Sequence, residues 1–413
     1  MDYAALKAQN KTLNYQEALA GEVRIKSKPL FFWFEICGPC NLKCAHCGFQ
    51  VFGRTSLEQV SERVYSEVIS ELMPTAYICN LGGTNWGEMT IGKHFQRFLL
   101  DAKRFGVRIN LTTNGTRMLD AWFEDLLDTL EVIGFSMEGI HEEFEKVRGF
   151  RWRHFLKNVE KVCQGRADRS KTFRVEWRYC AHADSIHQLP EMIRLAKSVG
   201  VDRIQVMNLV PYVESQKYKA LTYHRSLANQ YFAAGRAVAT ELNFDINIPP
   251  SFNTGAFRHT SPLQIRPLGS AAAADPTSAL SAGEAQTLDH ADLEMVNCYR
   301  PWQSCAVNEL GDVRPCCVYW KPMGNIRKDG FQSVWNGWAY RRLRATVNVK
   351  SDSICHSCRL PQFDSEHNRA SMQLAPSMKQ LLKASATSLF NKPRVRFAGV
   401  LDRDFEPKHD TVV

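Results

Sequence analysis

Short apolar runs alternate with amphipathic segments through the first half of the chain. The runs are rich in aromatic and β-branched residues and predict six strands, at residues 30–37, 76–83, 107–115, 131–139, 173–180 and 203–210. Between these runs, apolar residues recur at spacings of three and four, the pattern of helices that bury one face. A repeat of strand, helix and strand makes the strands parallel with right-handed crossovers. The sequence therefore predicts an α/β fold, as a barrel or a partial barrel.

Glycine and polar residues follow four of the predicted strands. They read GPCN after the first strand, GGTNWGE after the second, TTNGT after the third and SMEG after the fourth. A barrel of parallel strands carries its active site at the carboxyl ends of the strands. Each segment taken alone is also compatible with an ordinary turn.

The second half of the chain differs in composition. Residues 268–292 are rich in alanine and serine and poor in bulky apolar residues, which predicts a flexible insertion or linker. A module with clustered cysteines follows, and the basic end of the chain has no assigned role. The predicted divisions are an N-terminal extension at 1–29, a barrel at 30–250, a linker at 251–295, the cysteine module at 296–360 and a tail at 361–413.

Composition narrows the expected location and partners. The 413 residues are 44% apolar and carry a net charge of +9, but the basic residues are scattered, so we expect no nucleic-acid partner. The first 30 residues lack the apolar core of a secretion signal, and no stretch is long enough to cross a bilayer. We therefore expect a cytoplasmic protein with no membrane partner. Thiols stay reduced in the cytoplasm, so the 13 cysteines indicate metal binding rather than disulfides.

Four cysteines lie in the sequence CGPCNLKCAHC, directly after the first predicted strand. Cys40, Cys44 and Cys47 form a CxxxCxxC motif. Thiolates select iron–sulfur clusters or zinc, and a structural zinc site has four protein ligands. Three close cysteines at the mouth of a barrel favour a cluster with one iron left open. We expect the fourth, Cys37, to be a buried strand residue.

With this motif after its first strand, the sequence resembles the radical S-adenosylmethionine (SAM) enzymes over about residues 30–215. The resemblance implies a partial (β/α)6 barrel and a [4Fe-4S] cluster on Cys40, Cys44 and Cys47, whose fourth iron binds SAM. It also implies an external one-electron reductant of the flavodoxin or ferredoxin type. The electron cleaves SAM to a 5′-deoxyadenosyl radical, which abstracts a hydrogen atom from the substrate.

The resemblance extends to further positions. His46 stands where the family places an aromatic residue against adenine, and the segment WGEM resembles the one whose backbone contacts the SAM amino group. A guanidinium further along the chain can grip the SAM carboxylate with two hydrogen bonds. Each position could also be an ordinary turn or surface residue. The predicted SAM contacts are His46, Gly87, Glu88, Asn114, Ser136 and Arg148.

The cysteine module is similar to the SPASM and twitch extensions of radical SAM enzymes, which are small α+β domains that hold auxiliary clusters. It has a first cysteine, a Gly-x4-Cys pair, a GNI turn and a late CxxC. The predicted ligands are Cys298, Cys316, Cys355 and Cys358. Four thiolates close a [4Fe-4S] site and make it an electron carrier. Because no cysteine follows residue 358, we expect the shorter twitch form with one auxiliary cluster; the alternative is a structural zinc ribbon.

Four more cysteines could return a hydrogen atom to a substrate radical, with inert burial as the alternative for each. These candidates are Cys79, Cys180, Cys305 and Cys317. Polar residues in later strands, Glu176, Arg178 and Asn208, are candidates for lining the substrate pocket.

The two predicted clusters and the candidate hydrogen donors indicate dehydrogenation or epimerisation of a polar, hydroxylated small molecule, such as a sugar or aminocyclitol in natural-product biosynthesis. A peptide-modifying maturase is the alternative. We expect it less because only about 29 residues precede the first strand, too few for a separate leader-peptide-binding domain. An iron–sulfur electron-transfer protein is an alternative of a different class.

Overall fold

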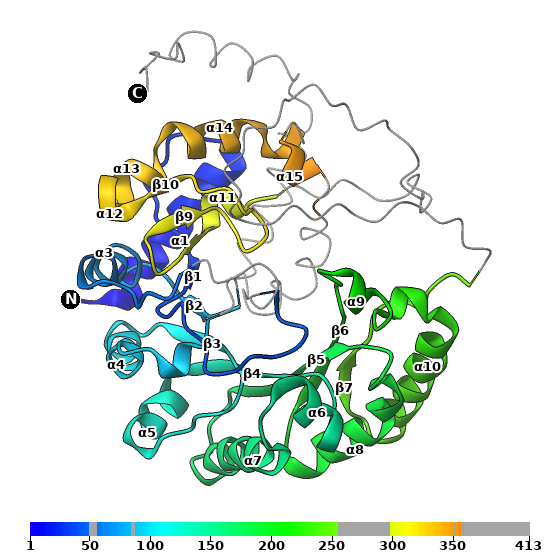
Figure 1. Ribbon diagram of the computed structural model, residues 1–413. Helices are drawn as coiled ribbons and strands as arrows, with labels where there is room; N and C mark the ends of the chain where they lie inside the picture. The colour runs from blue at the N-terminus through cyan, green and yellow to red at the C-terminus, as the bar shows by residue number, and fades with distance from the viewer. Residues whose placement is uncertain (49–55, 84–86, 255–297, 350–351, 357, 359–413) are drawn as a thin grey trace.

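The computed structural model of the protein describes residues 1–48, 56–83, 87–254, 298–349, 352–356 and 358 (Figure 1). The strands are β1 Phe31–Phe34, β2 Ile78–Leu81, β3 Arg108–Thr113, β4 Leu130–Met137, β5 Arg174–Ala181, β6 Arg203–Asn208, β7 Asp245–Asn247, β8 Ser304–Val307, β9 Asp312–Arg314 and β10 Gly324–Asn325. The α-helices are α1 Tyr3–Ala20, α3 Glu62–Leu72, α4 Phe95–Phe105, α5 Asp120–Thr129, α6 His141–Arg148, α7 Trp152–Asp168, α8 Leu189–Val199, α9 Glu214–Lys217, α10 Arg225–Glu241, α11 Arg300–Gln303, α12 Ile326–Asp329, α13 Phe331–Trp335, α14 Trp338–Thr346 and α15 Ser353–His356.

A single sheet contains all the strands of the described residues, in the order β10-β9-β8-β1-β2-β3-β4-β5-β6-β7. Strands β1 to β7 are parallel, as the strand–helix repeat predicted, and β1 to β6 confirm the six predicted strands. The sheet curves, and Figure 1 shows helices α4, α5, α7, α8 and α10 along its outer side. The predicted α/β fold is confirmed.

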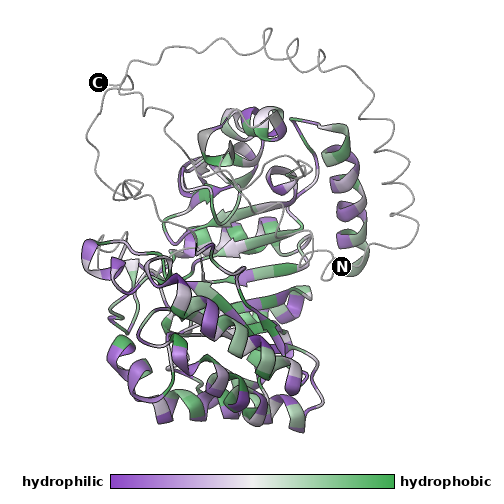
Figure 2. Cartoon of the chain, turned by 90° about the vertical axis from the view of Figure 1, so that its right-hand side faces the viewer, coloured by the Kyte–Doolittle hydropathy of each residue, from purple (hydrophilic) through white to green (hydrophobic). Residues whose placement is uncertain are grey.

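The two faces of the sheet differ in chemistry because successive side chains of a strand point to opposite faces. On β5, Trp177 and Tyr179 are fully buried and face the covering helices. Arg178 and Cys180 alternate with them and face the concave side of the sheet. Figure 2 shows mainly hydrophobic residues along the strands and a mixture of hydrophobic and hydrophilic residues along the helices. The concave face is therefore the polar surface available for chemistry.

The cysteine module extends this sheet instead of forming a separate one. Strand β8 pairs with β1 in parallel, with Phe31 opposite Ser304 and Phe34 opposite Val307, and β9 and β10 continue antiparallel. The N-terminal extension also contacts this module, because Asn14 donates a hydrogen bond to the carbonyl of Trp302 at 2.7 Å. The predicted extension and the predicted module thus pack together beside β1.

Among the described residues, no helix combines the length and the apolar character that a membrane crossing needs. The predicted linker and tail fall almost entirely outside the described residues.

Candidate functional site

The CxxxCxxC motif lies in the loop that follows β1, at the carboxyl edge of the parallel strands. Cys40, Cys44 and Cys47 are all partly buried and form no disulfide. Burial chiefly raises the pKa of the Cys44 thiol to about 12, and the nearby Cys40 and Cys47 thiols act in the same direction. The three sulfurs therefore share one poorly solvated region, where binding of a positively charged iron centre would favour the thiolate forms.

The donors of this loop are soft thiol groups, which select iron–sulfur clusters or zinc. Within the part of the chain that the structure describes, no three histidine, cysteine or acidic side chains converge as ligands of a single metal ion. Three thiols are one ligand short of a structural zinc site, so they favour a cluster with one iron left open.

Cys37 lies outside this group, as the sequence predicted. It is fully buried, forms an isolated β-bridge with Gln59 and accepts a hydrogen bond from the Gln59 side chain at 3.2 Å. Burial raises the pKa of its thiol to about 12. These two contacts tie the start of the cysteine loop to Gln59.

The Gly87–Glu88 segment is docked directly on the cysteine loop. A Cβ atom at Gly87 would lie 1.9 Å from the carbonyl oxygen of Cys37, so only glycine fits there. The backbone N–H of Glu88 donates to the carbonyl of Pro39 at 2.9 Å. The structure thus brings two of the predicted SAM contacts against the loop that carries the cysteines.

The Glu88 carboxylate organises the ends of two strands. It is almost fully buried and accepts hydrogen bonds from the hydroxyls of Thr90 at 2.7 Å and Thr113 at 2.8 Å. It also accepts the backbone N–H of Asn114 at 2.7 Å. With its oxygens occupied in this way, Glu88 holds neighbouring segments in place.

Asn114 reaches from this network to the cysteine loop. Its side-chain amide donates to the side chain of Asn41 at 2.9 Å and to the sulfur of Cys40 at 3.7 Å. Burial raises the pKa of the Cys40 thiol, whereas the Asn114 hydrogen bond lowers it. Asn114 is therefore the predicted site residue whose contact with a cysteine of the motif is explicit.

The Arg148 guanidinium is held by an acidic partner. Its guanidinium forms a two-pronged ion pair with Glu138, at 2.5 and 2.8 Å, and both side chains are buried. Burial alone would lower the pKa of Arg148, but the Glu138 carboxylate more than offsets it and the pKa is raised. Ser136 instead lies in register with Arg178 of β5. Arg148 also lies within electrostatic reach of Cys44 and lowers the pKa of its thiol, and the SAM contacts predicted for Arg148 and Ser136 stay predictions.

His46 packs against a histidine that sequence reasoning missed. The rings of His46 and His182 meet edge to face, with centroids 4.7 Å apart. Both are buried, and no ring nitrogen of either makes a hydrogen bond. Burial lowers the pKa of both, that of His182 to about 4, so both imidazoles are neutral at pH 7. The available signal was the position of His182 directly after β5.

The four candidate hydrogen donors separate by location. Cys79 and Cys305 are fully buried in the hydrophobic core, on the face of the sheet that the helices cover. That position favours inert burial, the alternative that the sequence left open for both. Cys180 lies on the concave face, where burial raises the pKa of its thiol to about 12, and Cys317 lies beside Cys316.

The concave face carries charged residues near Cys180. Glu176 is buried between Arg174 at 3.3 Å and Arg178 at 3.6 Å. Arg178 also donates to the hydroxyl of Thr112 across the sheet. Asn208 falls on the opposite face by alternation from Met207, which pairs with Cys180. Two of the three predicted pocket residues therefore share the concave face.

The second set of cysteines converges from distant parts of the module. Cys298 precedes α11, Cys316 follows β9, and Cys355 lies in α15. Burial chiefly raises the pKa of Cys355 to about 12, and the thiols of Cys298, Cys316 and Cys358 add to the effect. Four thiols within mutual electrostatic reach are what a fully ligated cluster needs.

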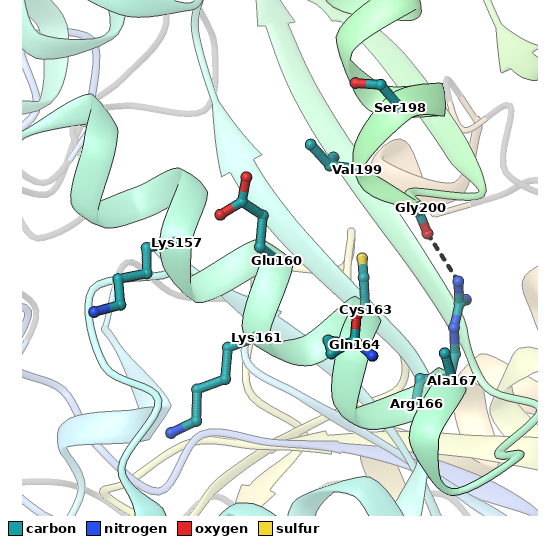
Figure 3. A pocket seen from close by; sticks show the side chains of 10 residues that line it. All are labelled: Lys157, Glu160, Lys161, Cys163, Gln164, Arg166, Ala167, Ser198, Val199 and Gly200. Atoms are coloured by element: carbon teal, nitrogen blue, oxygen red, sulfur yellow. Dashed lines mark hydrogen bonds between the residues drawn. The ribbon is translucent and has the colours of Figure 1, made fainter.

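One groove lies apart from all these residues. It has a volume of about 690 Å³ between α7 and α8, and Figure 3 shows Glu160, Cys163 and Ser198 among the side chains around it. It lies on the outer, helical layer and contains none of the predicted site residues. We therefore locate the candidate site at the carboxyl edge of the strands.

Comparison with known proteins agrees with this location. Residues 35–175 match the model of the Radical SAM superfamily, and residues 298–359 match SPASM, an iron–sulfur cluster-binding domain. The first match begins just before the cysteine loop, and the second contains all four cysteines that are predicted to bind the auxiliary cluster.

Three relatives illustrate the similarity. PqqA peptide cyclase of Bradyrhizobium diazoefficiens is 25% identical over 46% of this chain and 50% of its own length. The subtilosin biosynthesis protein AlbA of Bacillus subtilis is 24% identical over 81% of this chain and 65% of its own. The crystal structure of SuiB of Streptococcus suis with its precursor peptide SuiA has a TM-score of 0.50, at 17% identity, over 81% of this chain and 71% of that one. The SuiB likeness shows the shared fold.

The relatives correct the expected substrate class. Their names refer to peptide cyclisation and to biosynthesis of a bacteriocin, whereas we had expected a sugar or an aminocyclitol. The expectation of a hydroxylated small molecule is therefore wrong. That expectation relied on the short N-terminal extension as an argument against a peptide substrate. The chain spans about half the length of the first curated relative it matches.

Proposed function

Since the chain contains a radical SAM domain followed by a C-terminal SPASM domain, we propose that this radical SAM enzyme modifies a peptide. The domains imply a [4Fe-4S] cluster with SAM and auxiliary iron–sulfur chemistry. The observation that carries the proposal is that one sheet joins the region of the cysteine loop to the cysteine module. The chain also aligns over four fifths of its length with a bacteriocin biosynthesis protein.

The residues divide into two ligand sets. In this proposal Cys40, Cys44 and Cys47 hold the cluster that binds SAM. Four of the module's cysteines hold one auxiliary cluster, namely Cys298, Cys316, Cys355 and Cys358. When bound, the first cluster and SAM supply a 5′-deoxyadenosyl radical that takes a hydrogen atom from the substrate. Gly87 and Glu88 keep the cysteine loop against the strand ends, which fixes the space that SAM would occupy.

Two fates of the peptide radical fit the remaining residues. Loss of a proton from the radical and of an electron to the auxiliary cluster would complete a two-hydrogen oxidation of the peptide. Return of a hydrogen atom from the Cys180 thiol would instead invert a stereocentre and leave a thiyl radical, which an electron from the external carrier and a proton from solvent would restore to the thiol. The position of this thiol on the concave face supports it as the donor. The electron that starts each turnover would come from an external carrier of the flavodoxin or ferredoxin type.

The first experiment tests radical SAM chemistry. Full-length protein, reconstituted anaerobically and reduced with dithionite, should release 5′-deoxyadenosine and methionine from SAM. The triple variant Cys40→Ala, Cys44→Ala, Cys47→Ala should release neither and should lose the iron of one cluster. The matched double variant Cys298→Ala, Cys316→Ala should keep SAM cleavage and lose the auxiliary iron. If the wild-type protein releases no 5′-deoxyadenosine, it is an electron carrier and the proposal fails.

The second experiment tests the substrate class. Peptides encoded by short reading frames beside the gene would be synthesised and incubated with enzyme, SAM and dithionite in deuterated water. Loss of two hydrogens from a peptide indicates oxidation, and gain of one deuterium without that loss indicates inversion. In the second case Cys180→Ala should block product formation. A panel of peptides that all return unchanged, with SAM cleavage intact, would overturn the peptide assignment.

A further inference from the structure

The side chains of Asn41, Asn114 and Thr116 form a closed ring of hydrogen bonds beside Cys40. The Thr116 hydroxyl donates to Asn114 Oδ1 at 2.7 Å, and Asn41 Nδ2 donates to the Thr116 hydroxyl at 2.9 Å. Asn114 Nδ2 then donates to Asn41 Oδ1 at 2.9 Å and closes the ring. Every donor in the ring faces an acceptor.

This ring fixes which way the Asn114 amide points. The backbone N–H of Thr116 also donates to Asn114 Oδ1, at 3.0 Å. A backbone N–H can only donate, so the atom that faces it must be the oxygen of the amide. The NH2 group therefore faces the other way. One of its two hydrogens goes to Asn41, and the second is directed at Cys40 Sγ, 3.7 Å from the nitrogen.

The backbone of Asn114 is held just as firmly. Its N–H donates to the buried carboxylate of Glu88, which also accepts the Thr113 hydroxyl. Asn114 is 7% exposed, so water does not compete freely for its amide. The Asn114 amide is therefore a buried hydrogen-bond donor with a fixed orientation towards the Cys40 sulfur.

We propose that Asn114 is a positioning residue for the reduction potential of the barrel cluster, because its amide donates a hydrogen bond to the Cys40 sulfur. The inference rests on the proposed function, since it takes Cys40 to be a cluster ligand. It adds a role to the predicted one, which was contact with SAM.

The physical effect has a definite sign. Reduction adds one electron to a cluster whose negative charge extends onto its cysteine sulfurs. A hydrogen-bond donor at a sulfur stabilises the reduced form more than the oxidised form and raises the potential. Loss of the donor therefore makes the cluster harder to reduce.

The test is a redox titration of the SAM-free holoprotein, followed by electron paramagnetic resonance. In Asn114→Asp the amide donor becomes an acceptor with a negative charge, while the oxygen that faces Thr116 remains. The ratio of reduced to oxidised barrel cluster at a fixed potential should fall about tenfold or more, which corresponds to about 59 mV in a one-electron couple. Asn110→Asp makes the same chemical change four residues earlier, on β3, where the amide contacts Asn80. It should leave the barrel cluster within a few-fold of the wild-type ratio.

A second pair of variants tests the orientation of the amide without a change in charge. Thr116→Val removes the hydroxyl that closes the ring and should lower the same ratio by a smaller factor. Thr116→Ser keeps the hydroxyl and should restore the wild-type ratio. The auxiliary cluster serves as an internal reference in every variant, because its ratio should not change.

The outcomes separate the two proposals. The barrel signal is first identified as the one lost in the triple cysteine variant; if no signal is lost there, the proposed cluster assignment fails. If the signal is present but Asn114→Asp matches Asn110→Asp, the tuning role is overturned. A change in SAM affinity alone, with an unchanged SAM-free potential, would return Asn114 to the predicted SAM contact.

Discussion

At the scale of single residues, His182 is expected to make the protein sensitive to acid. Its imidazole is buried without a hydrogen bond, and burial lowers its pKa from 6.5 to about 4. Between about pH 6.5 and about pH 4 the unfolded chain binds this proton and the folded chain does not. Stability should therefore fall as the pH is lowered through this window, by no more than about 3 kcal/mol from this residue.

The variant His182→Phe keeps a ring in the same space and cannot titrate. Its thermal unfolding midpoint should be no lower than that of the wild type at about pH 7.5, because two buried nitrogens without partners are removed. From about pH 7.5 to about pH 5 its midpoint should fall less than that of the wild type. Equal losses in the two proteins would show that His182 does not carry the acid sensitivity.

Residue chemistry was predictable where it was local in sequence. The spacing of Cys40, Cys44 and Cys47 fits within one loop, so their grouping follows from the chain itself. The ion pair of Arg148 with Glu138 was not predicted, although the two residues are only ten positions apart. It depends on how the end of β4 and α6 pack together, which no one-dimensional pattern shows.

At the scale of elements, the docking of the Gly87–Glu88 segment on the cysteine loop can be tested through iron content. In Gly87→Ala the new methyl group would collide with the Cys37 carbonyl, so the Glu88 to Pro39 hydrogen bond should break. The segment and the loop should separate. We expect loss of most of the barrel cluster, with the auxiliary cluster retained, measured as iron per chain and by electron paramagnetic resonance.

Gly149→Ala is the matched control for this change. Gly149 ends α6 with a φ of 65°, and no atom lies within 4 Å of the position of an added Cβ. This variant should cost about 1 kcal/mol in backbone strain and keep both clusters. If Gly87→Ala also keeps its barrel cluster, the docked segment does not support the cysteine loop.

The elements themselves followed from periodicity, but their pairing did so only in part. Six strands were predicted and are present, since each is a short apolar run between helices. The parallel pairing of β8 with β1 joins residues about 270 positions apart, and no pattern within either strand indicates it. Pairing between distant strands depends on which sheet edge is left open once the barrel strands have formed.

At the scale of the whole molecule, β8 makes the two cluster-binding regions parts of one sheet. The sequence suggested separate domains because the alanine- and serine-rich segment divides the chain. The N-terminal extension strengthens the connection. Trp302 donates its indole N–H to the carbonyl of Glu22 at 2.7 Å, and Trp335 donates to the carbonyl of Ser27 at 2.9 Å. Both regions should therefore unfold as one unit.

Asn14 provides the test of this cooperativity. Its fully buried amide donates to Ser27 at 3.0 Å and to the carbonyl of Trp302 at 2.7 Å, so it links α1 to the cysteine module. Asn14→Ala leaves the Trp302 carbonyl without this donor and should cost about 1–3 kcal/mol. If the sheet unfolds as a unit, the loss of both iron signals on heating should shift together to lower temperature. A shift of the auxiliary signal alone would mean that the module unfolds independently of the barrel, despite the strand pairing between β8 and β1.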